Sequence, residues 1–279
     1  MPVARERPHA AFHELVRLPE KEIDLVEASL EIARDEYPRL SVRTYLARLD
    51  RLASGARRAI GKPRSLRVVV ERLNRFLFDD EGFRGNTDDY YDPRNSYLND
   101  VIDRRIGIPI TLTLVYMEVT RRLGYGIEGV GLPGHFIVRM AGRAELYVDP
   151  FNRGDILDRA DCIEKVRRLF NAPVEDSPEL LAVATKAQIL TRMLNNLKAI
   201  YLRQEVFAKA LPVLDKILLL DPENVQERRD RGLVLVRLKR YGEARTQLEQ
   251  FLEICPKDEE NQEMIQEATQ LLTWLGQLN

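Results

Sequence analysis

Cysteine is scarce in this sequence, with only Cys162 and Cys255 among its 279 residues. Two thiols cannot build the disulfide framework of a small secreted domain, so we expect both to be free in a reducing compartment. The chain also has no run of about 20 consecutive apolar residues that could cross a bilayer. Its first residues, MPVARERPHAAF, lack the apolar stretch of a secretory signal. The sequence therefore predicts a soluble, cytoplasmic protein that does not bind membranes.

Excess positive charge and histidine are lacking as well. The formal net charge is −1, which argues against a nucleic-acid binder that relies on bulk charge, although a local basic patch stays open. His9 and His13 lie near the N-terminus, so His135 has no obvious imidazole partner for a metal. The acidic segment 79–95 lacks the alternating carboxylate spacing of a calcium loop. We expect no cofactor and no metal.

Apolar residues recur at helical spacing in the first third of the chain. The stripes over 23–37, 42–53 and 66–76 predict three helices, with Ser41 as an N-cap of the second and a Gly-Lys-Pro break at 61–63 before the third. These stripes are typical of a packed core. We expect residues 1–80 to form an N-terminal helical region packed on the next domain.

The middle of the chain changes from helix to strand. Residues 109–123 are apolar around most of the helical circumference, which is typical of a buried helix, and Pro109 suits the first helical position. Strands are predicted over 125–132, 135–140 and 145–149, the last two joined in a hairpin through 141–144. A buried helix followed by antiparallel strands indicates an α+β core over 81–185, ending in a Pro-flanked acidic linker at 173–178.

The last third of the chain repeats itself. Ala210 and Ala244 lie 34 residues apart, as do Pro222 and Pro256, and the text KALPVLDKILLLDPEN aligns with EARTQLEQFLEICPKD. A period of about 34 residues in paired helices is the tetratricopeptide signature. We expect two such repeats over 186–279, closed by a capping helix from Glu263 to Leu278.

Two segments of the core resemble the histidine and aspartate motifs of the transglutaminase-like superfamily. They are GLPGHFIV, which ends at Val138 and contains His135, and YVDP, which contains Asp149. In that papain/transglutaminase-type fold a cysteine begins the buried helix, a histidine begins one strand and an aspartate lies on the neighbouring strand. In a hairpin centred on residues 142–143, positions 135 and 149 come nearly opposite each other, within hydrogen-bonding reach. The resemblance therefore implies two members of a Cys–His–Asp triad.

The nucleophile of that triad is missing. Counting back from Gly124, which ends the helix, the cysteine position falls on Pro109, and no cysteine occurs before Cys162. Cys162 follows the aspartate, which is the wrong chain order, so we interpret it as an ordinary buried thiol. The nearest hydroxyls are those of Ser96, Thr111 and Thr113, and Thr111 should point away from the lost cysteine. His135 and Asp149 either bind a ligand or only join two strands; both interpretations stay open.

A wider resemblance covers most of the chain. From EASLEIARDEYP through NSYLNDVIDRRIGIPITL to the repeats, the sequence is similar to a bacterial family that joins a transglutaminase-like core to tetratricopeptide repeats. A related domain occurs in a eukaryotic F-box protein, which by analogy favours recognition. We expect a protein or peptide partner, whose contacts would include Asn95, Tyr97, Asn99, Gly134, His135 and Asp149. The alternatives are a hydrolase or acyltransferase with a non-cysteine nucleophile, and a structural core whose repeats alone bind.

Overall fold

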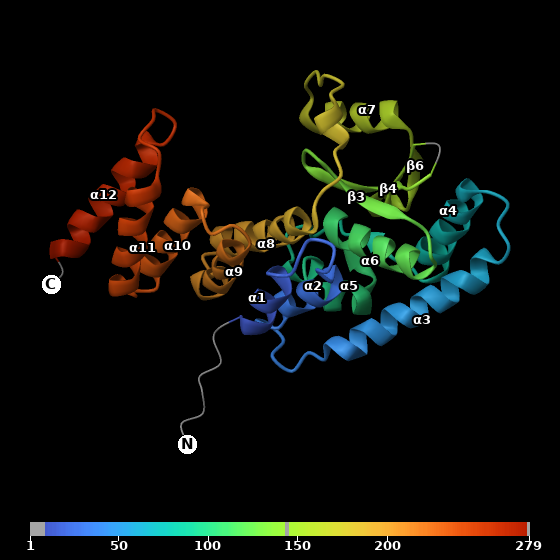
Figure 1. Ribbon diagram of the computed structural model, residues 1–279, viewed down its shortest axis with the longest axis horizontal. Coiled ribbons are helices and arrows are strands. Elements are labelled where there is room, and N and C mark those ends of the chain that lie inside the picture. The colour runs from blue at the N-terminus through green and yellow to red at the C-terminus, as the bar shows by residue number, and fades with distance from the viewer. Residues whose placement is uncertain (1–8, 143–144, 278–279) are drawn as a thin grey trace. The chain divides into compact units, whose positions relative to one another are not determined.

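Figure 1 shows the computed structural model, which describes residues 9–142 and 145–277. These residues form two compact units. The core unit is Leu18–Met193, and the repeat unit joins the described part of residues 194–279 to that of residues 1–17. No helix in the described ranges is long and apolar enough to cross a membrane.

Three helices open the core unit where the apolar stripes predict them: α2 (Leu25–Ala33), α3 (Val42–Ile60) and α4 (Leu66–Asn74). The Ser41 side chain accepts a hydrogen bond from the N–H of Thr44, which confirms the predicted N-cap. The α4 helix continues into a π-helical turn, η1 (Arg75–Asp80). The inward faces of these helices join one hydrophobic core, with Leu30, Leu49, Val70 and Leu73 fully buried.

The segment before the central helix contains β1 (Arg84–Gly85), η2 (Pro93–Asn95), α5 (Leu98–Arg104) and β2 (Ile106–Gly107), with β1 and β2 paired in parallel. The central helix, α6 (Pro109–Arg122), is buried along most of its length, as predicted. Pro109 is its first residue, where a missing N–H leaves no bond unmade. The Thr111 hydroxyl accepts from the N–H of Ile108 at 3.2 Å and donates to the carbonyl oxygen of Asn95 at 2.7 Å. These bonds tie the start of α6 to the preceding loop.

Four antiparallel strands follow in the order β3 (Ile127–Leu132), β4 (His135–Met140), β5 (Leu146–Asp149) and β6 (Asp155–Leu157). In the β4–β5 hairpin Val138 pairs with Val148 and Met140 with Leu146. The hairpin is therefore centred on position 143 rather than between positions 142 and 143, where it was predicted. Residues 143 and 144 of the predicted connection lie outside the described residues. The first three strands were predicted, and β6 was not.

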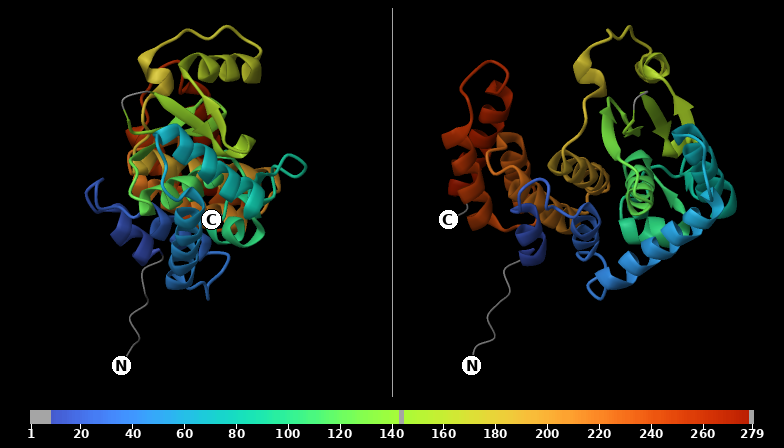
Figure 2. Two further views of the ribbon diagram at one scale, coloured as in Figure 1. Left: turned by 90° about the vertical axis from the view of Figure 1, so that its right-hand side faces the viewer. Right: turned by 45° about the vertical axis from the view of Figure 1, so that its right-hand side comes forward.

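The two faces of this sheet bury different side chains. Phe136, Val138 and Met140 join the core that contains α6, whereas Ile137 and Tyr147 pack with Cys162 and other residues of α7 (Arg159–Phe170). Figures 1 and 2 accordingly show α6 and α7 on opposite sides of the strands. Because side chains alternate along a strand, His135 and Asp149 belong to the α7 face.

The chain after β5 contains elements that sequence patterns did not predict. A 3₁₀ turn, η3 (Pro150–Asn152), precedes β6, and α7 fills a region for which no helix was predicted. The predicted linker at 173–178 leads into another 3₁₀ turn, η4 (Pro178–Leu181). The N–H of Ala184 then donates to Gly129 at 2.9 Å, and Val183 bridges to Val130. This stretch therefore packs along the edge of β3.

The repeat unit has the predicted pairs of helices. The helix α8 (Lys186–Arg203) runs from the core unit into it, and α9 (Phe207–Leu220), α10 (Val225–Arg237), α11 (Tyr241–Ile254) and α12 (Gln262–Gln277) follow. Ala210 and Ala244 are fully buried. A Cβ on Gly232 would lie 2.7 Å from a Leu248 methyl group, so α10 and α11 pack closely. The α12 helix is the predicted cap, whose expected last residue, Leu278, lies outside the described residues.

The fold class is the predicted one, an α+β core followed by tetratricopeptide helices. The division into parts at residues 80 and 185 stays a prediction. In the structure, α2 to α4 share one unit with the sheet, and α1 (Ala10–Val16) belongs to the repeat unit. There Phe12 is buried and lies under the ammonium group of Lys216, a residue of α9.

Candidate functional site

His135 and Asp149 form a buried hydrogen-bonded pair. The Nε2 atom of His135 lies 2.7 Å from Oδ2 of Asp149, and the two residues are 9% and 0% exposed. Continuing the hairpin register places Asp149 beside Ile137, so the contact with His135 is diagonal rather than directly across. The sequence therefore predicted the contact between His135 and Asp149, but it placed the two residues nearly opposite each other rather than diagonally.

The Asp149 carboxylate is saturated with donors. Its Oδ1 accepts from the N–H groups of Phe151 and Asn152 at 3.1 and 3.3 Å. Its Oδ2 accepts from His135, from the Asn152 side chain at 2.8 Å and from the Lys165 ammonium at 2.7 Å. Since an ionised carboxylate only accepts, Nε2 of His135 carries a proton. Nδ1 has no hydrogen-bond partner among the described residues.

Burial by itself raises the pKa of Asp149, because water no longer solvates the charge. The hydrogen bond and charge of His135, together with bonds from Lys165 and Asn152, outweigh this effect. They hold the pKa of Asp149 well below its usual range, so the residue is a carboxylate throughout the physiological range. The cluster thus consists of the Asp149 carboxylate, the Lys165 ammonium group and the His135 imidazole, which Asp149 orients.

The start of α6 lies next to the strand that carries His135. The Thr113 hydroxyl, one turn into the helix, donates to the carbonyl oxygen of Phe136 at 3.2 Å. Pro109, which we predict to stand where the superfamily carries its cysteine, is the first residue of this helix. A proline side chain has no nucleophilic atom.

The other candidate nucleophiles are buried. Thr111 and Thr113 are fully buried, and their hydroxyls bond to backbone carbonyl groups. Ser96 is 1% exposed, and its hydroxyl has no partner among the described residues. Cys162 is a free, buried thiol on α7, and burial raises its pKa to about 12. Such a thiol is not a nucleophile at neutral pH.

Aromatic and apolar side chains surround the pair. The Phe151 ring meets the His135 ring edge to face, with centroids 5.9 Å apart, and meets Tyr90 in the same way at 6.2 Å. Gly134, with φ +66°, precedes His135, and a Cβ there would lie 2.6 Å from a Leu169 methyl group. Five pockets formed by described residues have linings that include neither His135 nor Asp149. None of these five pockets therefore opens onto the pair.

Three of the predicted ligand contacts lie in the loop and helix before α6. Asn95 is fully buried, and its side chain donates to the carbonyl oxygens of Asp89 and Tyr90 at 2.8 and 3.2 Å. It therefore anchors the loop that carries Tyr90. Tyr97 is buried against Tyr37, edge to face, and Asn99 lines a separate pocket of about 470 Å³ with Tyr45. The role of these residues as ligand contacts stays a prediction.

Comparison with known proteins supports a transglutaminase-like core followed by tetratricopeptide repeats. A model described as the transglutaminase-like superfamily matches residues 43–195, more than half of the chain. The chain belongs to this superfamily. A model described as a tetratricopeptide repeat matches residues 197–270. In this superfamily member, the two matches follow each other along the chain as the sequence predicts.

Bacterial relatives cover nearly the whole chain. A UPF0162 protein of Xylella fastidiosa is 36% identical over 249 residues, which are 88% of this chain and 89% of that protein. A UPF0162 protein of Vibrio cholerae is 28% identical over 238 residues, covering 85% and 88%. F-box only protein 21 of Mus musculus is 32% identical over 170 residues, which are 57% of this chain and 26% of that protein. No solved structure matches the chain.

The repeat unit of this superfamily member has a pocket of its own. A pocket of about 680 Å³ is lined by apolar side chains that include Phe207, Leu271 and Trp274, with Arg229 and Glu267 among its polar residues. Trp274 is 41% exposed and meets Tyr241 edge to face at 5.7 Å. An exposed aromatic pair beside an apolar groove is typical of a protein-binding surface.

Lys165 is the member of the cluster that sequence reasoning missed. It lies on α7, a helix for which no pattern was recognised, and reaches Asp149 only because α7 packs over the strands. A lysine on an amphipathic helix gives no signal of its own. No group of three or more His, Cys, Asp or Glu residues in the described ranges could hold a metal ion.

Proposed function

We propose that this protein is a non-catalytic scaffold that binds a protein or peptide through its transglutaminase-like core, aided by its tetratricopeptide repeats. The proposal is supported by Pro109, the first residue of α6, which stands where we predict the superfamily's nucleophile, and by the bond from Thr113 of the same helix to the strand of His135. Without a nucleophile, an oriented imidazole can still donate to or accept from a ligand. The partner is a protein or peptide, with neither nucleic acid nor membrane proposed, and the cytoplasm is the proposed location.

Two features support binding over a purely structural role. The His135 imidazole is oriented through Nε2, so its Nδ1 atom is left for a ligand. Exposed apolar side chains, among them Tyr91 and Phe170 with 54% and 53% exposure, flank the residues around it. A pair that only joined two strands would need neither feature.

The test compares capture of partners by the full-length protein and by two variants. We expect His135→Ala to lose partners that the wild type retains, identified by cross-linking and mass spectrometry. Asp155→Asn, an exposed residue of β6, is the matched control and should retain them. Identical sets of cross-linked partners for wild type and His135→Ala would contradict binding at this site.

A second candidate function is hydrolysis or acyl transfer with a non-cysteine nucleophile or an activated water. It is favoured by the same free Nδ1, the atom that a general base would use. This function predicts turnover of amide, ester or glutamine-containing peptide substrates that Asp149→Asn abolishes. Such turnover would overturn the scaffold proposal, whereas its absence together with retained binding supports it.

A further inference from the structure

Arg192 is an exception among the arginines of the core unit. It lies on α8, is partly buried, and has no carboxylate partner among the described residues. Each other partly buried arginine of the described core unit pairs with a carboxylate: Arg48, Arg104, Arg105, Arg122, Arg139 and Arg159. A partly buried charge without a counter-ion costs free energy, and a bound anion would reduce that cost.

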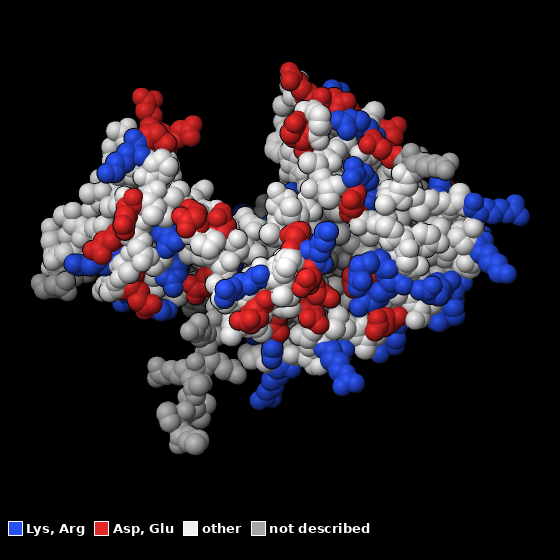
Figure 3. All heavy atoms as spheres, in the orientation of Figure 1, with Lys and Arg blue, Asp and Glu red and all other residues white. Residues whose placement is uncertain are grey.

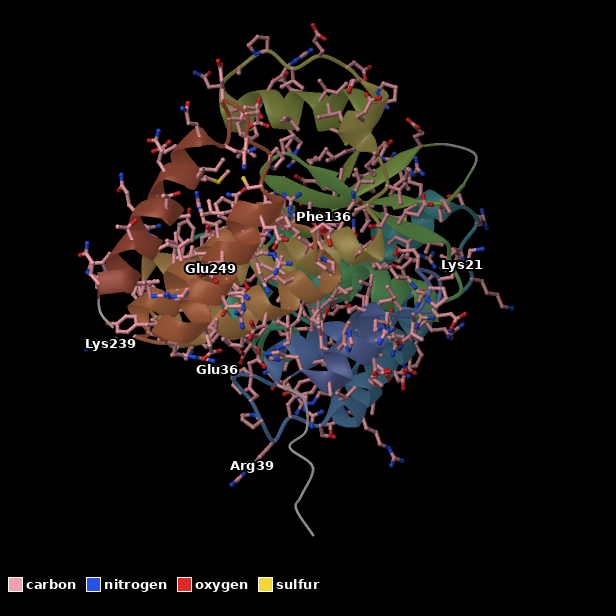
Figure 4. All side chains as sticks on the ribbon, turned by 60° about the vertical axis from the view of Figure 1, so that its left-hand side comes forward. Lys21, Glu36, Arg39, Phe136, Lys239 and Glu249 are labelled. Atoms are coloured by element: carbon pink, nitrogen blue, oxygen red, sulfur yellow. The ribbon has the colours of Figure 1, made fainter. Side chains whose placement is uncertain are left out.

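The position of Arg192 links it to the His135 site. Its Nη2 atom donates to the carbonyl oxygen of Leu132 at 3.0 Å, and Leu132 pairs with His135 at the end of the β3–β4 hairpin. Its guanidinium group lies over the Phe136 ring, 5.4 Å from the centroid; Figure 4 labels Phe136 on the sheet. The other N–H groups of the Arg192 guanidinium group have no acceptor among the described residues, so they could donate to a ligand.

Tyr90 supplies a second donor near His135, because both rings pack on Phe151. Burial raises the pKa of Tyr90, and the positive charge of Arg192 opposes that rise. The Tyr90 hydroxyl has no hydrogen-bond partner among the described residues. Its ring packs on Phe151, which in turn packs on His135. A phenol and a guanidinium group that both lack acceptors favour one shared anion.

The surroundings of this donor pair are apolar. Six large hydrophobic side chains are exposed in the described core unit, and four of them flank the site. Tyr90 and Tyr91 lie on the Phe151 side, and Leu169 and Phe170 lie on the Gly134 side. A cation rimmed by apolar side chains matches a carboxylate that stands next to an apolar side chain.

We infer that the sheet end at Leu132 and His135 binds a carboxylate-bearing peptide, with the carboxylate held by Arg192 and Tyr90 and a neighbouring apolar side chain against Phe151. The inference rests on the proposed binding function and specifies the chemistry of its partner. The carboxylate is either a chain terminus or an Asp or Glu side chain, and both are bound through the same two donors.

The test uses the full-length protein and four small probes at millimolar concentration. N-acetylphenylalanine and its amide test a terminal carboxylate; the amidated dipeptides acetyl-Phe-Glu and acetyl-Phe-Gln test a side-chain carboxylate. We expect at least one acid to bind about tenfold more tightly than its neutral counterpart in NMR titrations. Arg192→Gln should abolish this preference, and Tyr90→Phe should weaken it.

Two further variants keep the result interpretable. Arg168→Gln on α7, where the side chain is 79% exposed, removes a charge without removing the site and should leave the preference unchanged. Arg192→Lys keeps the charge but lacks the planar fork, so it should retain part of the preference even where Arg192→Gln does not fold. Equal binding of acid and amide, no binding of any probe, or an equal effect of Arg168→Gln would overturn the inference.

The outcomes separate this inference from the proposed function. If acids and amides bind alike while His135→Ala still abolishes partner capture, the carboxylate assignment fails and the scaffold function stands. If capture does not depend on His135, the scaffold function at this site fails, whatever the probes show.

Discussion

Asp149 is a fully buried carboxylate at the centre of a polar cluster in the core unit. It receives five hydrogen bonds from three residues and two backbone N–H groups, counted with the ammonium of Lys165. The same anion orients His135 and neutralises Lys165. Removing its charge leaves the partly buried ammonium group of Lys165 with only an amide as partner, which is costlier than losing a surface ion pair.

Asp149→Asn should therefore reduce the free energy of unfolding at pH 7 by about 3 kcal/mol. Because the pKa of Asp149 is lower in the folded state, its contribution is complete above the unfolded-state pKa of about 3.9 and is lost as the pH falls through the folded-state pKa. The difference between wild type and variant should shrink below about pH 4. Urea unfolding at pH 7 and below pH 4 measures the difference in free energy of unfolding, with Asp155→Asn as the control. A difference that does not depend on pH would contradict a charge effect.

At the scale of elements, tight turns hold the strands and helices around the site. Gly154, with φ +79°, follows η3, and a Cβ there would lie 2.4 Å from the Asn74 side chain. Asn74 is itself fixed, since it donates to the Gly154 carbonyl and accepts from the Tyr116 hydroxyl. The turn after Asp149 is therefore locked against the end of α4.

Gly154→Ala should reduce the free energy of unfolding by about 2 to 4 kcal/mol, combining left-handed strain with displacement of Asn74. Gly82→Ala is the matched control, because Gly82 has φ +76° and nothing within 4 Å of the added Cβ. It should lose only the strain, about 1 kcal/mol. Thermal or urea unfolding compares the two variants, and equal losses would mean that the Asn74 contact does not matter.

Two glycines of the repeat helices should change the stability in opposite directions when they are replaced by alanine. Gly232 in α10 faces the buried Leu248, so Gly232→Ala should destabilise the protein by about 1 to 3 kcal/mol through overpacking. Gly242 in α11 has open space around it, so Gly242→Ala should stabilise the helix by up to about 1 kcal/mol. Unfolding followed by the single tryptophan, Trp274, reports on this unit directly. The same sign for both variants would contradict the close α10–α11 packing.

At the scale of the whole molecule, charge is distributed unevenly. Residues 39–75 contain ten arginines and one lysine against two acids, a formal charge of +9 (eleven minus two) in a chain of total charge −1. Figure 3 shows Lys and Arg gathered over α3 and α4, whereas both signs are mixed elsewhere on that face. A local field of this size acts independently of the total charge.

We expect the full-length protein to be retained on a cation-exchange matrix at pH 7 and low salt, despite its sequence pI of about 6.4. Added salt should release it, because exposed charges are screened. Arg51→Glu with Arg58→Glu should abolish retention. The same change of charge through Lys239→Glu with Lys257→Glu should not; if it did, net charge rather than the α3–α4 surface would be responsible.

Local patterns were enough for much of the fold. The Ser41 cap, Pro109 at the start of α6, the β3 to β5 strands and the 34-residue repeat are encoded by neighbouring residues, so sequence spacing reveals them. The α7 helix has local signals, a capping box of Asp158 with Asp161 and an apolar stripe through Cys162 and Val166, but they were not recognised, whereas β6 is too short to show a pattern. They are stabilised by packing on the sheet, which is a tertiary effect.

The sequence by itself determined the family, the fold class and the absence of any cysteine before Cys162. It also indicated His135 and Asp149. Only the tertiary structure placed Lys165 on Asp149, Arg192 on the Leu132 carbonyl group and Tyr90 on Phe151 beside His135. These side chains come from different elements, far apart in sequence, and contact between them depends on how helices pack on strands rather than on any local pattern.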